Sequence, residues 1–518
     1  GTDMLFTPYT NEPFADFTDP ATLASFKAAV ADVAGRLGRD YPLTIGGAAV
    51  TTGAWLESFD PSHKRRLVGR AAAAGPAEID RAMDAAWAAY DSWSRWSMAE
   101  RARLLVKLAA IMRRRREELA AWLVFEASKN YLEAIADVAE AIDFCEYYAR
   151  TALPLAEPLP THDHPGEENV TLFQPMGVGV VIPPWNFLLA ILVGTTVGPV
   201  VVGNTVILKP SPATPVIAAK FMELVAEAGF PPGVINLLTG EDAVLGDALV
   251  DHPRTRFINF TGSVATGVRI YERAAKVQPG QTWLKRTFLE MGGKDALIVD
   301  ETADLEEAAR AAVASAFGFQ GQKCSAMSRL IVVDKVHDEL LARVKELTER
   351  LSVGPADENH DVTAVINERQ YQKVLGYVEA GKREARLVTG GEAAPGDGWY
   401  VKPTVFADVA PSATIACDEI FGPVVAVIRA RDFAHALEIA NASAYALTGG
   451  VFSGSRENLA RARAEFQAGN LYLNRKITGA LVGVQPFGGF KMSGSNTKAG
   501  GPDYLRNFVE MKTITERY

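Results

Sequence analysis

Three polar side chains with complementary chemistry stand beside small, aromatic or glycine-rich neighbours. Cys324 lies in "AFGFQGQKCSA", Glu290 in "LEMGGKD" and Asn186 in "PPWNF". A thiolate is a nucleophile, an asparagine amide donates uncharged hydrogen bonds to an oxyanion, and a carboxylate can serve as a base. Singly, each has a plainer reading: a cysteine buried in a core, an asparagine in a turn, a glutamate on the surface. Together they predict covalent acyl chemistry at a thiol.

Two further stretches suit a dinucleotide. In "FTGSVATG", Gly262 permits close backbone approach, and Ser263 can cap a helix whose positive end attracts a pyrophosphate. In "ILKPS", Lys209 stands at the C-terminal end of an apolar strand, where open α/β sheets bind ligands. Each signal is weak alone, because a lone lysine is more often on the surface. No G-x-G-x-x-G follows the first strands, so an ordinary Rossmann fingerprint is absent.

These residues lie among strands and helices that are predicted to alternate along the chain. Long amphipathic helices are predicted over residues 77–150, and strand–helix alternation then runs through two series with a boundary near residue 289. Such alternation predicts parallel sheets with helices on both faces. Residues 187–202 are apolar but short and interrupted by Gly and Pro, which favours a buried helix over a membrane span.

Bulk composition narrows the function classes. The chain has 518 residues, 48% hydrophobic and 22% charged, as expected of a soluble globular protein with at least two domains. A net charge of −9 argues against nucleic acid as a partner. Three cysteines and seven histidines form neither a disulfide framework nor a metal-ligand spacing. With no recognisable signal sequence either, we expect a cytoplasmic protein with no membrane, metal or nucleic-acid partner.

The motifs occur together in a known order. "PWNF", "LKPS", "FTGS", "LEMGGK", "GQKCS", "EIFGPV" and "PFGGFKMSG" resemble the aldehyde dehydrogenase superfamily in order and spacing, from about residue 40 onward. Met291 departs from the usual leucine, a change of little volume. The resemblance implies that Cys324 is the nucleophile and that Asn186 and the Cys324 N–H form the oxyanion hole. It makes Glu290 the base that activates water for thioester hydrolysis.

The resemblance also implies an NAD site. Lys209 and Ser211 would face the adenine ribose, Ser263 the pyrophosphate and Glu419 the nicotinamide ribose. The full set of cofactor residues is Ile182, Pro184, Trp185, Lys209, Ser211, Gly262, Ser263, Glu419 and Phe421, the last packed near the nicotinamide ring. NAD-preferring relatives often carry Glu three residues after the lysine, where this chain has Pro212. With nothing nearby in the sequence to repel a 2′-phosphate, weaker use of NADP is also expected.

Other stretches favour one branch of the superfamily. "SAFGFQGQKCSA", "GNLYLNR", "TGALVGVQPFGGFKMSG" and "KAGGPDYL" resemble enzymes that oxidise L-glutamate γ-semialdehyde, formed from 1-pyrroline-5-carboxylate, to glutamate in proline catabolism. The expected substrate residues are Glu140, Phe187, Lys323, Ser325, Gly479, Ala480 and Phe487. Ser325 and the N–H groups of Gly479 and Ala480 would hold the α-carboxylate, and Glu140 the ammonium.

Some of these substrate assignments stay open. Asp137 or Glu133 could replace Glu140, because the helix register is uncertain. Lys323 could lower the pKa of the thiol or point to solvent. Phe187 and Phe487 would flank the aliphatic part of the substrate, although plain core packing would explain both.

The fold implied is two Rossmann-like open-sheet α/β domains with a small β-flap. We expect a cofactor domain from residues 1–166 and 182–289, a catalytic domain from 290–495, and an oligomerisation flap from 167–181 and 496–518. The flap would pair across subunits of a homodimer or larger homo-oligomer. A different semialdehyde or a broad range of aldehydes is an alternative substrate, and contact with a proline dehydrogenase is left open. A coenzyme-A-acylating enzyme is disfavoured by Glu290, and an inactive scaffold by the presence of all three catalytic candidates.

Overall fold

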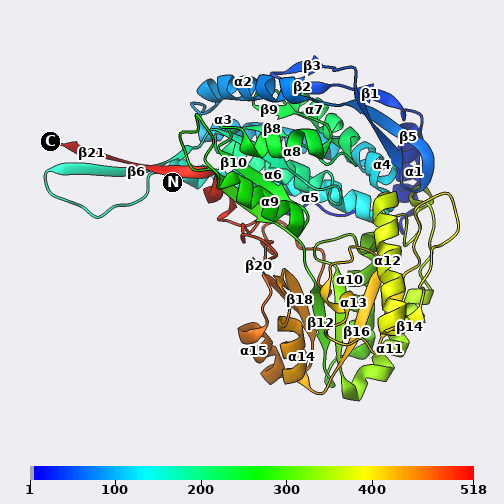
Figure 1. Ribbon diagram of the computed structural model, residues 1–518. Helices are drawn as coiled ribbons and strands as arrows, with labels where there is room; N and C mark the ends of the chain where they lie inside the picture. The colour runs from blue at the N-terminus through cyan, green and yellow to red at the C-terminus, as the bar shows by residue number, and fades with distance from the viewer. Residues whose placement is uncertain (1–4) are drawn as a thin grey trace.

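The computed structural model describes residues 5–518, so residues 1–4 of the predicted cofactor domain lie outside the described part of the chain. Two α/β units lie one above the other, and a long β-hairpin projects from the side of the first (Figure 1). Each unit is built on one twisted sheet with helices packed on it. The predicted fold class is therefore confirmed.

The first unit contains a seven-stranded sheet within residues 5–518. Its strands, in spatial order, are β11 (Arg286–Glu290), β10 (Phe257–Thr261), β7 (Val178–Ile182), β8 (Thr205–Leu208), β9 (Ile235–Leu237), β2 (Leu43–Ile45) and β3 (Ala48–Val50). The five strands from β11 to β9 are parallel, and β2 and β3 add an antiparallel edge. The central strands are buried throughout, as expected for a parallel sheet covered on both faces.

Two hydrophobic cores cover the two faces of this sheet. Its helices are α1 (Pro20–Ala34), α2 (Pro76–Trp93), α3 (Met98–Arg114), α4 (Arg116–Ala127), α5 (Tyr131–Ala152), α6 (Ala190–Val201), α7 (Pro215–Ala228), α8 (Asp242–Asp251) and α9 (Val264–Ala274), with the 3-10 turn η1 (Leu153–Ala156). The long helices predicted over residues 77–150 are thus α2 to α5. The apolar stretch 187–202 contains α6, a buried helix as predicted.

The second unit repeats the plan with residues 295–473. Its sheet runs β14 (Arg386–Thr389), β15 (Thr404–Ala407), β16 (Val424–Ala430), β13 (Met327–Val333), β12 (Asp295–Val299), β18 (Thr448–Phe452) and β19 (Asn470–Leu473). All neighbouring pairs are parallel except β14 with β15. The helices are α10 (Leu305–Phe317), α11 (Asp334–Glu349), α12 (Glu368–Glu384), α13 (Thr414–Cys417), α14 (Phe433–Asn441) and α15 (Arg456–Glu465), with η2 (Gly318–Gly321) and η3 (Ala356–Glu358).

Three small sheets complete the chain. They pair β1 (Arg39–Tyr41) and β4 (Trp55–Asp60) with β5 (His63–Ala72), β17 (Tyr445–Ala446) with β20 (Phe490–Lys491), and β6 (Glu167–Pro175) with β21 (Val509–Arg517). The tight turn between β4 and β5 reaches the second unit, where Ser62 accepts at its carbonyl from the Tyr400 hydroxyl, 3.0 Å away.

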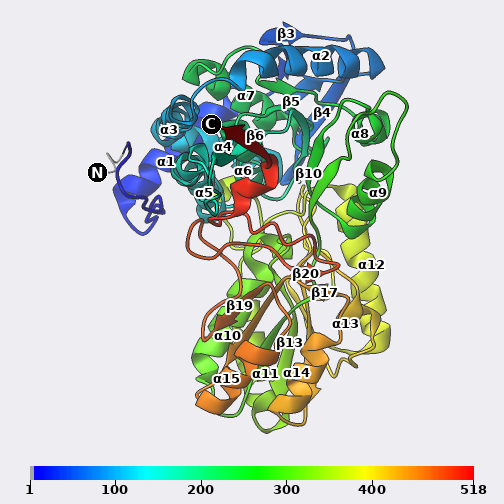
Figure 2. The same cartoon turned by 90° about the vertical axis from the view of Figure 1, so that its left-hand side faces the viewer.

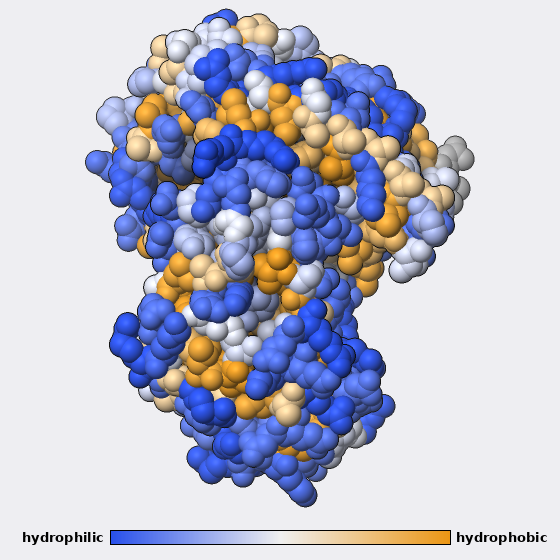
Figure 3. Space-filling view, turned by 90° about the vertical axis from the view of Figure 1, so that its right-hand side faces the viewer, coloured by the Kyte–Doolittle hydropathy of each residue, from blue (hydrophilic) through white to orange (hydrophobic). Residues whose placement is uncertain are grey.

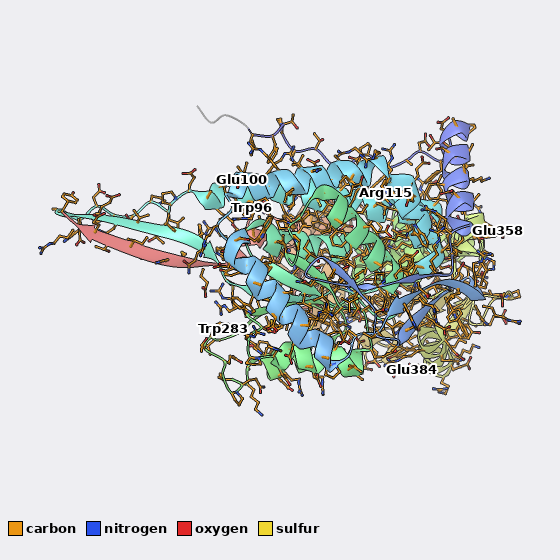
Figure 4. The ribbon with its side chains drawn as sticks, turned by 90° about the horizontal axis from the view of Figure 1, so that it is seen from above. Trp96, Glu100, Arg115, Trp283, Glu358 and Glu384 are labelled. Atoms are coloured by element: carbon orange, nitrogen blue, oxygen red, sulfur yellow. The ribbon has the colours of Figure 1, made fainter. Side chains whose placement is uncertain are left out.

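The projecting hairpin is smaller than the sequence predicted. Seen from above, β6 and β21 extend well beyond the body (Figure 4). Residues 178–181, assigned to the flap, instead belong to β7 at the centre of the first sheet. Residues 504–508, also assigned to it, form the 3-10 turn η4 (Tyr504–Phe508) and pack in the core of the first unit. Those assignments were wrong because both segments are apolar enough to be buried.

The surface is mainly hydrophilic where Figure 3 shows it, with scattered hydrophobic residues around the narrower junction of the two units. Among residues 5–518, no helix is long and apolar enough to cross a membrane.

Candidate active site

The two sheets meet at the end of β11. Glu290 is the last residue of that strand, and the chain passes through Gly292 and Gly293 into β12 of the second unit. The segment after β20 holds this connection in place, because the Met291 N–H donates to the carbonyl oxygen of Ser493 at 2.8 Å. The junction therefore fixes the direction in which the Glu290 side chain leaves the sheet.

The loop before Cys324 adopts an unusual backbone conformation. Phe319, Gln320 and Gly321 have φ values of 46°, 55° and 68°. Gly321 must be glycine, because a Cβ there would lie 2.3 Å from the carbonyl oxygen of Gly422. The Gln320 side chain secures the loop through bonds of 3.1 Å to Ala364 O and 2.9 Å from Thr363 N. Left-handed residues held in this way are typical of functional loops.

Asn186 lies beside the thiol. It is buried in the turn after β7, and its Nδ2 donates to Gln322 O at 3.1 Å. Burial, with the neighbouring carboxyls of Glu419, Glu290 and Asp295, raises the pKa of the Cys324 thiol well above its usual range, while a hydrogen bond from Asn186 lowers it. This environment favours the protonated thiol, so a proton acceptor is needed to generate the nucleophile.

Glu290 has the properties of such an acceptor. Its Oε1 is buried and has no hydrogen-bond partner within residues 5–518. Burial raises the pKa of Glu290 to about 8, and the charge of Lys498 opposes that rise. A carboxyl titrating near neutral pH is suited to general base catalysis.

A cavity of about 260 Å³ lies next to this group. Its walls include all seven residues that the sequence assigned to the substrate, together with Glu290: Glu140, Phe187, Lys323, Ser325, Gly479, Ala480 and Phe487. Cys324 lines a small adjoining pocket, with Lys323 common to both. The structure thus brings the predicted substrate residues together beside the thiol.

The three acidic candidates on α5 differ in their partners. Asp137 forms a buried ion pair with Lys129, 2.9 Å between Oδ2 and Nζ. Glu133 accepts from Lys323 at 2.9 Å. Glu140 has neither an ion-pair nor a hydrogen-bond partner among the described residues, and burial, with Asp137 nearby, raises its pKa to about 8. Glu140 is therefore the carboxyl left for a cationic ligand.

Lys323 does not point to solvent. Its ammonium is directed to Glu133 at the cavity wall, and the residue also lines the pocket of Cys324. The sequence could not predict this, because Glu133 lies 190 residues away along the chain.

The predicted cofactor residues line the opposite side of the junction. Lys209 directly follows β8, is buried, and pairs with Asp242 at the start of α8. Ser211 lines a pocket of about 410 Å³ shared with Glu241 and Asp242. The expectation that nothing near Pro212 would repel a 2′-phosphate is therefore wrong, since two carboxylates come to this pocket from the loop and helix after β9.

The remaining cofactor residues suit a dinucleotide. Ser263 caps α9 by accepting from Thr266 N–H at 3.2 Å, which leaves the positive helix end beside Gly262. Glu419 accepts from Gly293 N–H at 2.8 Å, and a Cβ at Gly292 would lie 2.5 Å from its carboxylate. This glycine cradle holds a carboxylate next to Cys324, where a ribose hydroxyl could bind.

Aromatic residues border the same cleft. The rings of Trp185 and Phe421 meet edge to face with centroids 5.5 Å apart. Trp185 also lines the pocket of Ser211, and Phe421 the pocket of Cys324, so this pair lies between the two. Ile182 ends β7 and Pro184 begins the turn toward Asn186.

Some residues of the site were not singled out from the sequence. Lys129 and Lys476 supply positive charge near Glu133, and Lys498 supplies it near Glu290. Phe14 adds an aromatic wall from far upstream. Lys498 is the first residue of "KAGGPDYL" and Lys476 directly follows "GNLYLNR", so these two could have been suspected from the sequence. Residues 5–518 contain no cluster of three or more His, Cys, Asp or Glu side chains that could hold a metal ion.

A thiol, an amide donor and a buried carboxyl at the junction of two open sheets are the arrangement expected of an enzyme that oxidises aldehydes through a thioester. A model of the aldehyde dehydrogenase family matches residues 49–514. The chain belongs to the aldehyde dehydrogenase family.

Individual relatives are similar over almost their whole length. The chain is 56% identical to a 1-pyrroline-5-carboxylate dehydrogenase of Geobacillus kaustophilus, covering 99% of both chains. It is 52% identical to 1-pyrroline-5-carboxylate dehydrogenase 2 of Bacillus subtilis, covering 99% of this chain and 100% of the relative. A crystal structure of 1-pyrroline-5-carboxylate dehydrogenase from Thermus with bound NAD is 54% identical, with a TM-score of 0.99 over 99% of this chain and 100% of that one.

Proposed function

We propose that this enzyme oxidises L-glutamate γ-semialdehyde, formed from 1-pyrroline-5-carboxylate, to L-glutamate with NAD, as a step of proline catabolism. The observation that carries the proposal is the pairing of charges in the cavity. Among the described residues of α5, Glu140 is the cavity carboxyl without an ion-pair or hydrogen-bond partner, and Ser325, Gly479 and Ala480 line the same cavity as potential donors. The head group of an amino acid carries an ammonium, which complements the Glu140 carboxylate, and a carboxylate, which complements the donors of Ser325, Gly479 and Ala480. The names and near full-length similarity of the relatives support the same substrate.

The reaction starts at Cys324. Glu290 accepts the thiol proton, and the thiolate attacks the aldehyde carbon to give a hemithioacetal oxyanion. Asn186 Nδ2 and the Cys324 N–H donate to that oxyanion, and each donor in comparable sites contributes about 3 kcal/mol to the transition state. NAD, when bound, accepts the hydride, so that the carbon becomes a thioester. Glu290, having passed its first proton to solvent, then takes a proton from water, whose oxygen attacks the thioester. The C–S bond breaks, the thiolate recovers a proton, and the carboxylic acid leaves.

The cofactor is held by the residues around the cleft. Lys209 and Ser211 bind the adenine ribose, Ser263 and Gly262 the pyrophosphate at the start of α9, and Glu419 the nicotinamide ribose. Ile182, Pro184, Trp185 and Phe421 form the apolar walls. The glycines beside Glu419 and the free space around Ser211 support this assignment.

The oligomer and the domains are part of the proposal. The chain comprises a cofactor domain, a catalytic domain and a flap, and the hairpin of β6 and β21 carries the flap into a neighbouring subunit of a homodimer or larger assembly. Met511 and Ile514 are 64% and 44% exposed on the hairpin, which supports burial against another subunit. We propose a cytoplasmic location, and whether a proline dehydrogenase partner contacts the enzyme stays open.

NADH formation tests the function directly. Pyrroline-5-carboxylate, propanal and succinate semialdehyde are compared at equal concentration with the wild type, Cys324→Ala and Cys417→Ala. We expect a strong preference for the first substrate, loss of activity in Cys324→Ala, and unchanged activity in Cys417→Ala, whose thiol is exposed on the surface. Equal rates on all three substrates would contradict the proposed substrate and indicate an aldehyde dehydrogenase of broad specificity. Full activity in Cys324→Ala would contradict the role of Cys324 as the nucleophile.

A further inference from the structure

The N-terminal segment lies beside the substrate cavity, outside the residues that match the family model. That match begins at residue 49, whereas residues 6–17 form neither helix nor strand. Contacts of Tyr9 with Tyr147 and of Phe17 with Tyr131 place this segment along α5, and Figure 2 shows it in dark blue at the edge of the first unit, near α1 and α5. Both ends are fastened to this unit. Near the start, Arg150 Nε donates to Thr7 O at 2.7 Å. Near the end, the ring of Phe17 contacts those of Phe26 and Tyr131, with centroids 5.2 and 5.9 Å away.

Asn11 in this segment joins two walls of the cavity. Its Nδ2 donates to Asp143 Oδ2 at 3.0 Å and to Val482 O at 2.9 Å. Asp143 lies one helical turn after Glu140 on α5, and Val482 lies two residues after Ala480. One amide group therefore spans the distance between the acidic wall and the loop that carries Gly479 and Ala480.

Neighbouring contacts reinforce this bridge. Glu12 N–H donates to Asp143 Oδ1 at 2.7 Å, and the Tyr9 hydroxyl donates to Val482 O at 3.1 Å. Gly483 allows the close approach, because its φ is 79° and a Cβ there would lie 3.0 Å from the Tyr9 ring. The loop that carries Gly479 and Ala480 thus rests on the N-terminal segment.

Phe14 supplies the outer wall of the cavity. It lines the cavity together with Leu132 of α5, and the two side chains are 52% and 54% exposed. Ser325, by contrast, is 9% exposed at the inner part of the same cavity. Phe14 and Leu132 therefore mark where the cavity opens to solvent.

We propose that residues 6–17 form a substrate clasp, in which Asn11 sets the separation of the two head-group walls and Phe14 limits the length of aldehyde accepted. Asn11 is a positioning residue that acts through Asp143 and Val482. Phe14 is a specificity residue at the cavity mouth. The inference rests on the proposed function for the identity of the head group, but the limit on length does not depend on it.

The role of Phe14 is tested with aldehydes of two lengths. Phe14→Ala is compared with the wild type and with Leu284→Ala, which removes another exposed apolar side chain outside the cavity. We expect Phe14→Ala to raise kcat/KM for hexanal about tenfold relative to propanal, in line with the discrimination that apolar pockets achieve. The Leu284→Ala ratio stays at the wild-type value. A ratio unchanged in Phe14→Ala overturns the length limit, whichever aldehyde the wild type prefers.

The role of Asn11 is tested by separating KM from kcat. Asn11→Ala should raise the KM for pyrroline-5-carboxylate about tenfold while kcat with propanal stays within twofold, and Asn11→Gln should restore part of the loss. Thr18→Ala is the matched control, since it removes a hydroxyl just after this segment that, among the described residues, bonds to Asp16 alone. An unchanged KM in Asn11→Ala overturns the positioning role. A wild type that does not favour pyrroline-5-carboxylate would instead reject the proposed function.

Discussion

Lys129 and Asp137 form an ion pair with 2.9 Å between Nζ and Oδ2, and both side chains are fully buried. The Lys129 ammonium also lies 4.5 Å from the ring centroids of Phe187 and Phe319. Asp137 Oδ1 accepts from Ala190 N–H at 2.6 Å, at the start of α6. The pair therefore joins α5 and α6 to the loop that precedes Cys324, and it occupies the carboxylate that otherwise competes with Glu140 for the substrate.

Breaking this ion pair should lower stability. In Asp137→Asn the Lys129 charge stays buried without a counter-charge, which costs about 3–5 kcal/mol in comparable pairs. The midpoint of urea unfolding measures the effect. Asp91→Asn is the control, because its pair with Arg95 is 75% exposed on both sides and is worth less than about 1 kcal/mol. Equal midpoints in the two variants would contradict a structural role for the Lys129 pair.

Removing the Glu140 charge should weaken binding of the amino acid substrate alone. Loss of a partly buried charge partner predicts at least a tenfold rise in the KM for pyrroline-5-carboxylate in Glu140→Gln, with propanal kinetics unchanged. Because burial raises the pKa of Glu140 to about 8, the wild-type KM should fall as pH rises through 8, and the variant should lack that fall. Glu146→Gln, on the same helix outside the cavity, provides the comparison. A matching rise in KM for propanal would argue against an ammonium partner.

Lys498 should set the pH range of thioester hydrolysis. Glu290 acts as a base only when ionised, and burial raises its pKa to about 8, so kcat should increase through that pH. The Lys498 charge lowers that pKa, so in Lys498→Met the kcat profile should move to higher pH. Lys491→Met is a matched control, with the same backbone φ of 51° and an ammonium bound instead to Asn441 O and Ser443 O. Coincident profiles in both variants would show that Lys498 does not reach Glu290.

The acidic lining of the ribose pocket should disfavour NADP. Asp242→Ser removes one of two carboxylates beside Ser211 and should raise kcat/KM with NADP about tenfold relative to NAD, because like charges at this range repel by 1 kcal/mol or more even when solvated. Asp242 and Asp247 both lie on α8 and each pairs with a cation, but Asp247 does not line the pocket of Ser211, so Asp247→Ser should leave the ratio unchanged. No gain in Asp242→Ser would assign the NAD preference to another feature.

The sequence predicted the parts of the site that local pattern specifies. Lys209 follows a run of buried strand residues, and Ser263 stands between a strand and a helix, so their places at strand and helix ends followed from periodicity alone. Cys324, Glu290 and Asn186 stood out by residue type and neighbours, and the resemblance then assigned a role to each. The structure brings these three to one junction.

Contacts between residues far apart along the chain could not be predicted from the sequence. Lys323 bonds to Glu133, 190 residues away, and Lys209 bonds to Asp242, 33 residues away. The local sequence around each residue gives no sign of its partner. The flap boundaries failed for a related reason. Apolar residues 178–181 and 504–508 could suit either a flap or a core, and only the assembled sheet decides between them.

Residues near the C-terminus complete the core of the first unit. Asn204, buried after α6, donates to Phe508 O at 2.9 Å across 304 residues, and the ring of Tyr504 stacks on Tyr148 with centroids 5.0 Å apart. The second sheet, by contrast, is drawn from the continuous stretch 295–473. On a ribosome, all strands of the second sheet are therefore synthesised before the last core residues of the first unit, so the unit that begins first is the last to receive its complete core.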